Sequence, residues 1–258
     1  MDYQTILYDF GGGIGVITLN RPEKMNALTS QMRAEIADAV QRATREARVV
    51  VITGAGRAFC TGQDLGDSGC AAAADFERVL RDEYEPMIRA IAEAKVPVIA
   101  AVNGPAAGAG ANLALACDVV IAAESAYFLQ AFAKIGLLPD AGGTFTLPRR
   151  IGMARAMGAA LFAERVSAAQ AVDWGLIWEA FPDESFEAGW RGRAEHLATG
   201  PTVAFGAIKE AMQASLGNSF DDQLSLEARL QGRCGGTRDF KEGVLAFLEK
   251  RPAAFEGR

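Results

Sequence analysis

The stretch from Val98 to Asp118 constrains the fold more strongly than any other part of the chain. It begins with an apolar run, Val98–Val102, that predicts a buried strand, and a break at residues 103–105 ends this run. Residues 106–111 carry almost no side-chain bulk, and Asn112–Cys117 suits a helix. A helix that starts directly after such a strand and turn leaves its first backbone N–H groups without intrahelical acceptors, so they favour negative charge.

A second segment of the same design lies upstream. Val49–Thr53 predicts a strand, and a loop of mostly small and polar residues, Gly54–Leu65, follows it. Two strands that each end in such a loop can aim two backbone N–H groups at one point. That arrangement is an oxyanion hole, which stabilises the negative oxygen formed in acyl chemistry.

Composition narrows the class of protein and its partners. The 258 residues suffice for one full domain, and a hydrophobic content of 50% supplies a core. A net charge of −6 and a pI of about 5.0 argue against a nucleic-acid partner and against a basic membrane-binding surface. The four cysteines show no close pairing, and the N-terminus lacks the basic and apolar regions of a signal peptide. We therefore expect a soluble, reduced, cytoplasmic protein.

Hydrophobic periodicity and turn residues predict the other elements. A hairpin is expected from Thr5–Phe10 and Ile14–Asn20, followed by a helix from about Thr29. Ser167 and Gln170 have the spacing of a capping box. Further helices are predicted over Asp75–Ala92, Thr202–Leu216, Phe220–Gly232 and Phe240–Lys250.

Several familiar kinds of site are excluded. The one histidine, His196, lies near a predicted helix end, which leaves little room for a Ser-His-Asp triad or a histidine-rich metal site. The glycine pairs at 54/56 and 108/110 lack the third glycine of a dinucleotide fingerprint. Backbone oxyanion stabilisation combined with a carboxylate is the chemistry that remains, with no metal ion.

Four motifs occur in order along the chain: Arg21-Pro22…Asn26-Ala27-Leu28, Gly56–Asp64, Asn103-Gly104…Gly108-Ala109-Gly110…Cys117-Asp118 and Pro139–Thr144. Together these motifs resemble the crotonase, or enoyl-CoA hydratase/isomerase, superfamily. The resemblance implies an α/β fold built as a spiral of ββα units, with a core over residues 1–200 that binds acyl-CoA. It also implies a C-terminal helical region over 201–258 that completes the coenzyme A site and forms a homotrimer or a dimer of trimers. Coenzyme A would be part of the substrate, so no separate cofactor is implied.

By position, the resemblance makes the backbone N–H groups of Gln63 and Ala109 the two oxyanion donors. The alternative is that the glycines around them only allow tight turns. The two glutamates that hydratases of this family use correspond here to Asn112 and Phe132. A standard hydratase mechanism is therefore disfavoured, because adding water needs one group to activate water and another to manage the α-proton.

Asp140 offers a carboxylate at a third position. The run from Gln130 to Asp140 is similar to the branch of the family that isomerises ring-1,2-epoxyphenylacetyl-CoA in phenylacetate degradation. Two interpretations stay open, since an Asp before Ala-Gly-Gly-Thr is also a natural helix N-cap. Burial in an apolar pocket would raise the pKa of this carboxyl, whereas a helix N-terminus would lower it.

Other residues are implied as contacts to the acyl-CoA, each with a simpler alternative. Arg21, Lys24 and Lys250 could pair with phosphates or could be solvated surface charges. Asp64 could instead be a hydrogen-bond acceptor that fixes its loop, and Tyr84 could be ordinary core packing. The remaining candidates along the substrate path are Ala58, Leu65, Gly108, Asn112, Phe132 and Phe247.

Three functions follow from these residues. The first is an acyl-CoA isomerase with Asp140 as its one base. The others are a hydratase with an unusual acid and base, and a catalytically silent acyl-CoA-binding homologue. The second half of the chain carries many large apolar side chains, and we expect them to be buried against other subunits. These residues are Trp174, Leu176, Ile177, Trp178, Phe181, Trp190, Phe205, Phe220 and Phe247.

Overall fold

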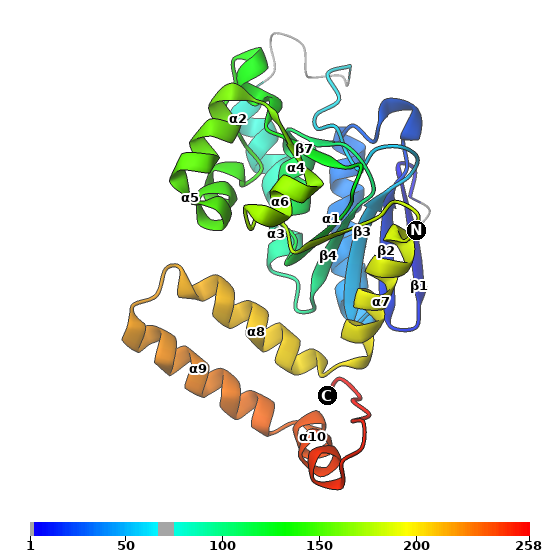
Figure 1. The fold of residues 1–258 in the computed structure, drawn as a ribbon, viewed down its shortest axis with the longest axis vertical. Coiled ribbons are helices and arrows are strands. Elements are labelled where there is room, and N and C mark those ends of the chain that lie inside the picture. The colour runs from blue at the N-terminus through cyan, green and yellow to red at the C-terminus, as the bar shows by residue number, and fades with distance from the viewer. Residues whose placement is uncertain (1–2, 67–74) are drawn as a thin grey trace.

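The computed structural model describes residues 3–66 and 75–258 and shows a six-stranded sheet at the centre of the molecule (Figure 1). The chain enters it through an antiparallel hairpin of β1 (Ile6–Gly11) and β2 (Ile14–Leu19), as the sequence predicts. Gly12 and Gly13 form the turn and both have positive φ, which glycine adopts without steric cost.

The other strands of this sheet run parallel, in the order β1-β2-β3-β4-β6-β9. They are β3 (Val49–Gly54), β4 (Val98–Val102), β6 (Val119–Ala123) and β9 (Glu179–Phe181). Figure 1 shows α7 (Phe186–Thr199) in front of the sheet and α1 (Ser30–Glu46) behind it. Cover on both faces explains why β4 is buried along its whole length and reads as a continuous apolar run.

A smaller sheet carries the second half of the spiral. It contains β5 (Ala106–Ala107), β7 (Tyr127–Leu129) and β8 (Arg165–Ser167). The capping box is confirmed: Ser167 and Gln170 exchange hydrogen bonds at the start of α6 (Ala168–Asp173). These strands escape prediction from the sequence because runs of two or three residues are too short to show a period of two.

The predicted helix over residues 75–92 is interrupted. The structure has α2 (Phe76–Val79), a π-helical turn over Leu80–Tyr84, and then α3 (Glu85–Ala92). The wider π turn shifts the buried face, because a residue is added to one turn. Tyr84 and Met87 are consequently buried while Phe76 is exposed, so these residues do not share the single face that uniform helical spacing predicts.

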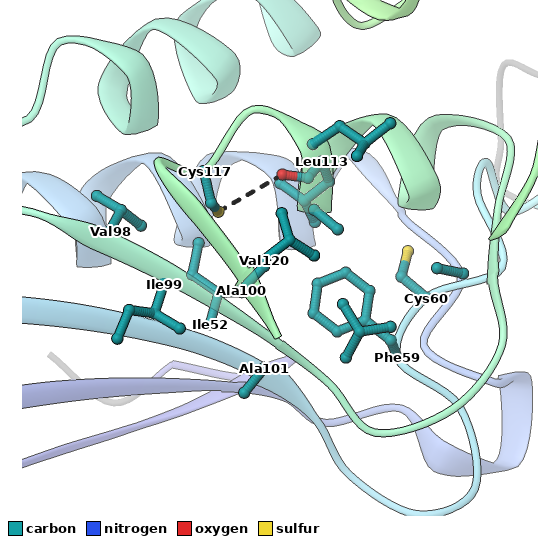
Figure 2. Packing of buried hydrophobic residues seen from close by; sticks show 14 of the residues in the cluster. Ile52, Phe59, Cys60, Val98, Ile99, Ala100, Ala101, Leu113, Cys117 and Val120 are labelled. Carbon is teal, nitrogen blue, oxygen red and sulfur yellow. Dashed lines mark hydrogen bonds between the residues drawn. The ribbon is translucent and has the colours of Figure 1, made fainter. Parts of the chain in front are cut away.

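Two helix starts determine the site. Helix α4 (Ala109–Leu115) begins three residues before the predicted start at Asn112, directly after Gly108. Helix α5 (Gly143–Phe162) begins after Gly142 and is kinked at Gly152, where φ is +74. Figure 2 shows the packing beneath them: Phe59 and Cys60, which follow β3, lie in the same apolar cluster as Ile99 of β4 and Leu113 of α4.

The last three helices leave the body of the molecule (Figure 1). They are α8 (Thr202–Ser215), α9 (Phe220–Gly235) and α10 (Arg238–Glu249). Helices α8 and α9 share a small apolar cluster of their own around Ala207, Leu226 and Leu230. Lys209 of α8 anchors them through an ion pair with Asp118, at 2.8 Å. A division of the chain at residues 200/201 into two independent units stays a prediction. No helix in the described part of the chain is long and apolar enough to cross a bilayer.

Candidate active site

The loops that follow β3 and β4 are in direct backbone contact. Ala107 N–H donates to the carbonyl of Cys60 at 2.9 Å, and Cys60 pairs with Ala106 in an isolated parallel bridge. A side chain on Gly110 would clash with the carbonyl of Cys60. Glycine is therefore required where α4 crosses this loop, and the small residues of the sequence serve a close approach between two segments.

Ala109 provides the first backbone N–H of α4. Gly108 before it has φ +53 and ψ −130, a conformation that favours glycine, and its own N–H donates to the carbonyl of Leu129 at 2.8 Å. Ala109 itself has no positive φ, so its methyl group causes no strain. Within residues 3–66 and 75–258, no acceptor is paired with the Ala109 N–H.

Gln63 lies on the neighbouring loop. The residues on either side of it are bonded to Leu28: Leu28 N–H donates to Gly62 at 2.7 Å, and Asp64 N–H donates to Leu28 at 3.0 Å. In such a parallel bridge the central residue turns its own N–H to the opposite side. A Cβ built on Gly62 would lie 3.4 Å from the Ala109 nitrogen, so this loop passes beside the start of α4.

Arg33 is a functional candidate that the sequence reasoning missed. Its side chain is only 1% exposed, and its Nη1 donates to Gln63 Oε1 at 2.8 Å. The signal was present in the sequence, since Arg33 precedes Ile36 and Val40 by three and seven residues and so lies on the buried stripe of α1. A buried arginine at such a position needs acidic or polar partners.

Those partners come from the π-helical turn. The Arg33 guanidinium forms an ion pair with Glu83 and lies over the ring of Tyr84, with 4.6 Å between Cζ and the ring centroid. The Tyr84 hydroxyl also donates to Gln63 Oε1. Burial raises the pKa of Tyr84, so the phenol stays protonated and acts as a donor.

Asp140 does not cap a helix, and that interpretation is wrong. The N-cap of α5 is Gly142, with φ +82, and Ala141 before it also has positive φ. These two left-handed residues turn the chain between Asp140 and the helix. The Asp140 main-chain carbonyl accepts from Gly143 N–H at 2.8 Å, while its side chain makes no capping bond to the helix.

The Asp140 carboxyl is instead a buried, titratable group. Its Oδ1 is shielded from solvent and has no hydrogen-bond partner in the described part of the chain. Burial raises its pKa to about 6, while its own backbone N–H and the charge of Arg33 act in the opposite direction. Of the two opposing influences expected from the sequence, desolvation is therefore the larger.

The comparisons with known proteins agree with this geometry. Residues 9–258 match the family described as Enoyl-CoA hydratase/isomerase. A protein named a probable enoyl-CoA hydratase, from Rhodobacter capsulatus, is 62% identical over all of both chains. The chain belongs to the enoyl-CoA hydratase/isomerase family.

Two further relatives mark the range of this family. A 1,2-epoxyphenylacetyl-CoA isomerase from Escherichia coli is 46% identical over 95% of this chain and 96% of its own. The crystal structure of an enoyl-CoA hydratase from Bacillus anthracis superposes with a TM-score of 0.91 at 33% identity, covering 99% of this chain and 100% of that one. The crotonase-type fold is thereby established, while hydratase and isomerase names both occur among the relatives.

The two positions at which hydratases of the family carry glutamates hold no acid here. Asn112 is buried and donates through Nδ2 to the Asp140 carbonyl at 2.8 Å. Phe132 is buried as well, and its ring would lie 3.9 Å from a Cβ built on Gly108. Asn112 of α4 thus ties the main chain of Asp140 to this helix.

The loop residues predicted to contact coenzyme A are arranged as a hydrogen-bonded group. Asp64 accepts from Arg21 and from Gly66 N–H, at 2.8 and 2.9 Å, and the Arg21 bond lowers the pKa of Asp64. Asp64 is therefore placed as a loop-fixing acceptor. Ala58 is buried, whereas Lys24 and Leu65 are exposed.

The structure does not bring the C-terminal candidates to the rest of the site. Phe247 and Lys250 lie at the end of α10, at the far end of the molecule from α4 in Figure 1, and Phe247 is 83% exposed. Three of the apolar residues predicted to lie against other subunits are instead buried in the core of this same chain. Those three are Leu176, Ile177 and Trp190.

Other sequence expectations concern metals, cysteines and histidine. The described residues contain no group of three His, Cys, Asp or Glu side chains that could hold a metal ion. Cys60, Cys117 and Cys234 are free thiols, and Cys70 lies outside the described residues. His196 is exposed in the last turn of α7, as its position near a helix end predicts.

Proposed function

We propose that this family member is an acyl-CoA isomerase that moves a proton with Asp140 as its single base. The observation that supports it is the Asp140 carboxyl. It is shielded, its Oδ1 has no hydrogen-bond partner among residues 3–66 and 75–258, and its pKa is raised to about 6. A pKa near the working pH suits a group that must both take up and release a proton. Loss of the capping interpretation removes the main support for a catalytically silent homologue.

In the proposed mechanism the thioester oxygen binds the backbone N–H groups of Gln63 and Ala109. Asp140 removes a proton from the acyl chain, and the electrons form an enolate whose negative oxygen lies between the two donors. Each such donor contributes about 3 kcal/mol to the stability of this intermediate. Asp140 then returns the proton to a different carbon, so the double bond moves and no atom is gained or lost.

A ring-epoxide substrate is the more specific form of this proposal. It is supported by the similarity between residues 130–140 and the branch that acts on ring-1,2-epoxyphenylacetyl-CoA, and by the relative from Escherichia coli whose name carries that activity. The competing proposal is hydration of an enoyl-CoA, which the 62% identical relative favours by its name. Hydration would require Asp140 and a second group that replaces the missing glutamates.

Asp140→Asn separates catalysis from folding. The variant keeps the side-chain shape and removes the base, so isomerisation of trans-3-hexenoyl-CoA, followed by the absorbance of the conjugated product, should fall by about 10²- to 10⁴-fold. Crotonyl-CoA, followed by loss of absorbance, measures hydration in parallel. Asp183→Asn, which alters an exposed acceptor on the β6–β7 side of the molecule, is the control and should keep full activity. Unchanged isomerisation by folded Asp140→Asn would overturn the proposal.

We also propose assembly into a homotrimer or a dimer of trimers. Three large side chains of the second half are strongly exposed in the single chain: Trp178 at 68%, Phe220 at 77% and Phe247 at 83%. Apolar surface of this kind is commonly buried against another subunit. A neighbouring subunit could then present Phe247 and Lys250 to the coenzyme A portion of the substrate.

A further inference from the structure

A row of two side-chain amides, those of the buried Gln130 and of Asn112, leads to the Asp140 loop. Gln130 follows β7, at the start of the 3-10 turn Ala131–Ile135, and is 4% exposed. Its Nε2 donates to Asn112 Oδ1 at 2.9 Å, and Asn112 Nδ2 donates to the main-chain carbonyl of Asp140 at 2.8 Å. Asn112 thereby bonds to Gln130 on one side and, on the other, to Asp140, which lies 28 residues further along the chain.

The direction of this row is fixed by its last member. A backbone carbonyl can only accept, so Asn112 must present its nitrogen to Asp140 and its oxygen to Gln130. Gln130 must in turn present its own nitrogen to Asn112. The Gln130 Oε1 then faces away from the row, buried and without a protein partner in the described part of the chain. An orientation that leaves a buried acceptor unpaired is costly, so another interaction must compensate for it.

The Asp140 carboxylate depends on this row for its place. Its Oδ1 has no hydrogen-bond partner among the residues that the structure describes, so the position of the side chain follows that of its own main chain. Two bonds hold the Asp140 carbonyl: one from Gly143 N–H and one from Asn112 Nδ2, both at 2.8 Å. The Asn112 amide also packs closely against Gly143 at the start of α5, where an added Cβ would clash with it.

We propose that Gln130 is a positioning residue for the Asp140 carboxylate and acts through Asn112. The inference rests on the proposed function, because it matters for turnover only if Asp140 is the base. Asn112 stands at a position where hydratases carry a catalytic acid, and here its side chain supports a different acid, Asp140. Restoring a glutamate at Asn112 would therefore remove the support of Asp140 and would not simply add hydration.

The test is a double-mutant cycle in the full-length protein. Gln130→Met keeps the length of the side chain and removes its donor; Asn112→Ala removes both bonds of the asparagine. Each change should lower kcat for trans-3-hexenoyl-CoA by about 10- to 100-fold, because a base misplaced by about 1 Å loses rate on this scale. KM should change less than about two-fold, because misplacing the base weakens the transition state and not the binding of the substrate.

Non-additivity is the decisive result. If Gln130 acts only through Asn112, adding Gln130→Met to Asn112→Ala should lower kcat no further. Gln170→Met is the matched control: it also removes a glutamine side-chain bond, in the capping box of α6, and should leave kcat unchanged. Multiplicative losses in the double variant, or an unchanged kcat in Gln130→Met, would overturn the inference.

A crystal structure of Gln130→Met tests the same inference without a measurement of activity. The Asp140 carbonyl and carboxylate should shift from their wild-type positions, and an unshifted loop would contradict the positioning role. Failure of the proposed function looks different: Asp140→Asn would then be fully active, whatever the loop does in Gln130→Met. Should Gln130→Met not fold, Gln130→Leu replaces it in the cycle, because leucine also has no N–H to donate.

Discussion

Arg33 Nη1 donates a hydrogen bond to Gln63 Oε1 at 2.8 Å, and this bond connects the buried stripe of α1 to the loop of the proposed oxyanion hole. Tyr84 donates to the same oxygen from the π-helical turn. Gln63 is thus held by its side chain in the loop that passes beside the start of α4. A donor that is fixed before substrate arrives does not need to reorganise during the reaction, which is the basis of oxyanion stabilisation.

Arg33→Met should therefore damage both folding and catalysis. It leaves Glu83 without its cation and removes the Arg33 bonds to the Leu28 carbonyl and Gln63 Oε1. Breaking such a pair from one side costs about 3 kcal/mol of unfolding free energy. Urea unfolding measures the loss. Arg89→Met, which removes an arginine from exposed pairs on α3, should change the unfolding free energy by less than about 0.5 kcal/mol. Equal losses in the two variants would contradict the role of Arg33.

The rate of isomerisation should depend on the ionisation of Asp140. Burial raises the pKa of this carboxyl to about 6, and only the ionised form can remove a proton. We expect kcat/KM for trans-3-hexenoyl-CoA to rise with pH and to level off above about pH 6 to 7. Measurement of kcat/KM at a series of pH values, with controls for the buffers, tests this expectation. A profile that is flat from pH 5 to pH 8 would assign the proton transfer to another group.

The contribution of Asp140 to the unfolding free energy should depend on the same pKa, but it should fall with rising pH while the rate of isomerisation rises. Since the folded-state pKa of Asp140 lies above its ordinary value of 3.8, the folded protein holds the proton more tightly than the unfolded chain. This favourable contribution is complete below about pH 4 and is lost as the pH rises through about 6. Asp140→Asn cannot ionise, so its unfolding free energy relative to wild type should increase between these two pH values and then stay constant. Urea unfolding at fixed protein concentration tests it, and a difference that decreases with pH would refute it.

Gly143 should tolerate no side chain. A Cβ there would clash with the amide of Asn112, so Gly143→Ala should lower the unfolding free energy by about 1–3 kcal/mol and reduce turnover through the Asp140 loop. Gly158 lies on the same helix, α5, with no atom within 4 Å of its Cβ position. Gly158→Ala should raise the unfolding free energy by about 0.5–1 kcal/mol, as alanine does in helices. The opposite signs separate a specific contact from a general response of the helix.

Self-association should be visible in solution. Light scattering at micromolar concentration should give the mass of a trimer or hexamer, and a stable monomer would contradict the proposal. Phe247→Asp places a charge on one of the most exposed apolar residues of α10, so it should shift the mass toward monomer. Lys241→Asp changes a charged residue of the same helix and serves as the control.

Much of the fold could be predicted from the sequence alone. The hairpin, the strands Val49–Gly54 and Val98–Val102 and the capping box at Ser167 follow from local patterns, because periodicity and cap chemistry act over only a few residues. The family also follows from the sequence, since its motifs keep their order along the chain. Local patterns do not reveal the π turn over Leu80–Tyr84, because one added residue in a turn leaves an amphipathic helix looking continuous.

The candidate site divides along the same line. The sequence by itself indicated Gln63, Ala109 and Asp140, and it left the role of Asp140 open between base and cap. Only the tertiary structure decided against the cap, because two left-handed residues separate Asp140 from the helix that it precedes. Arg33 and Gln130 became visible in the same way: their partners lie 30 and 18 residues away in sequence. Burial and hydrogen bonding across such distances depend on how the segments pack, and no local pattern encodes that packing.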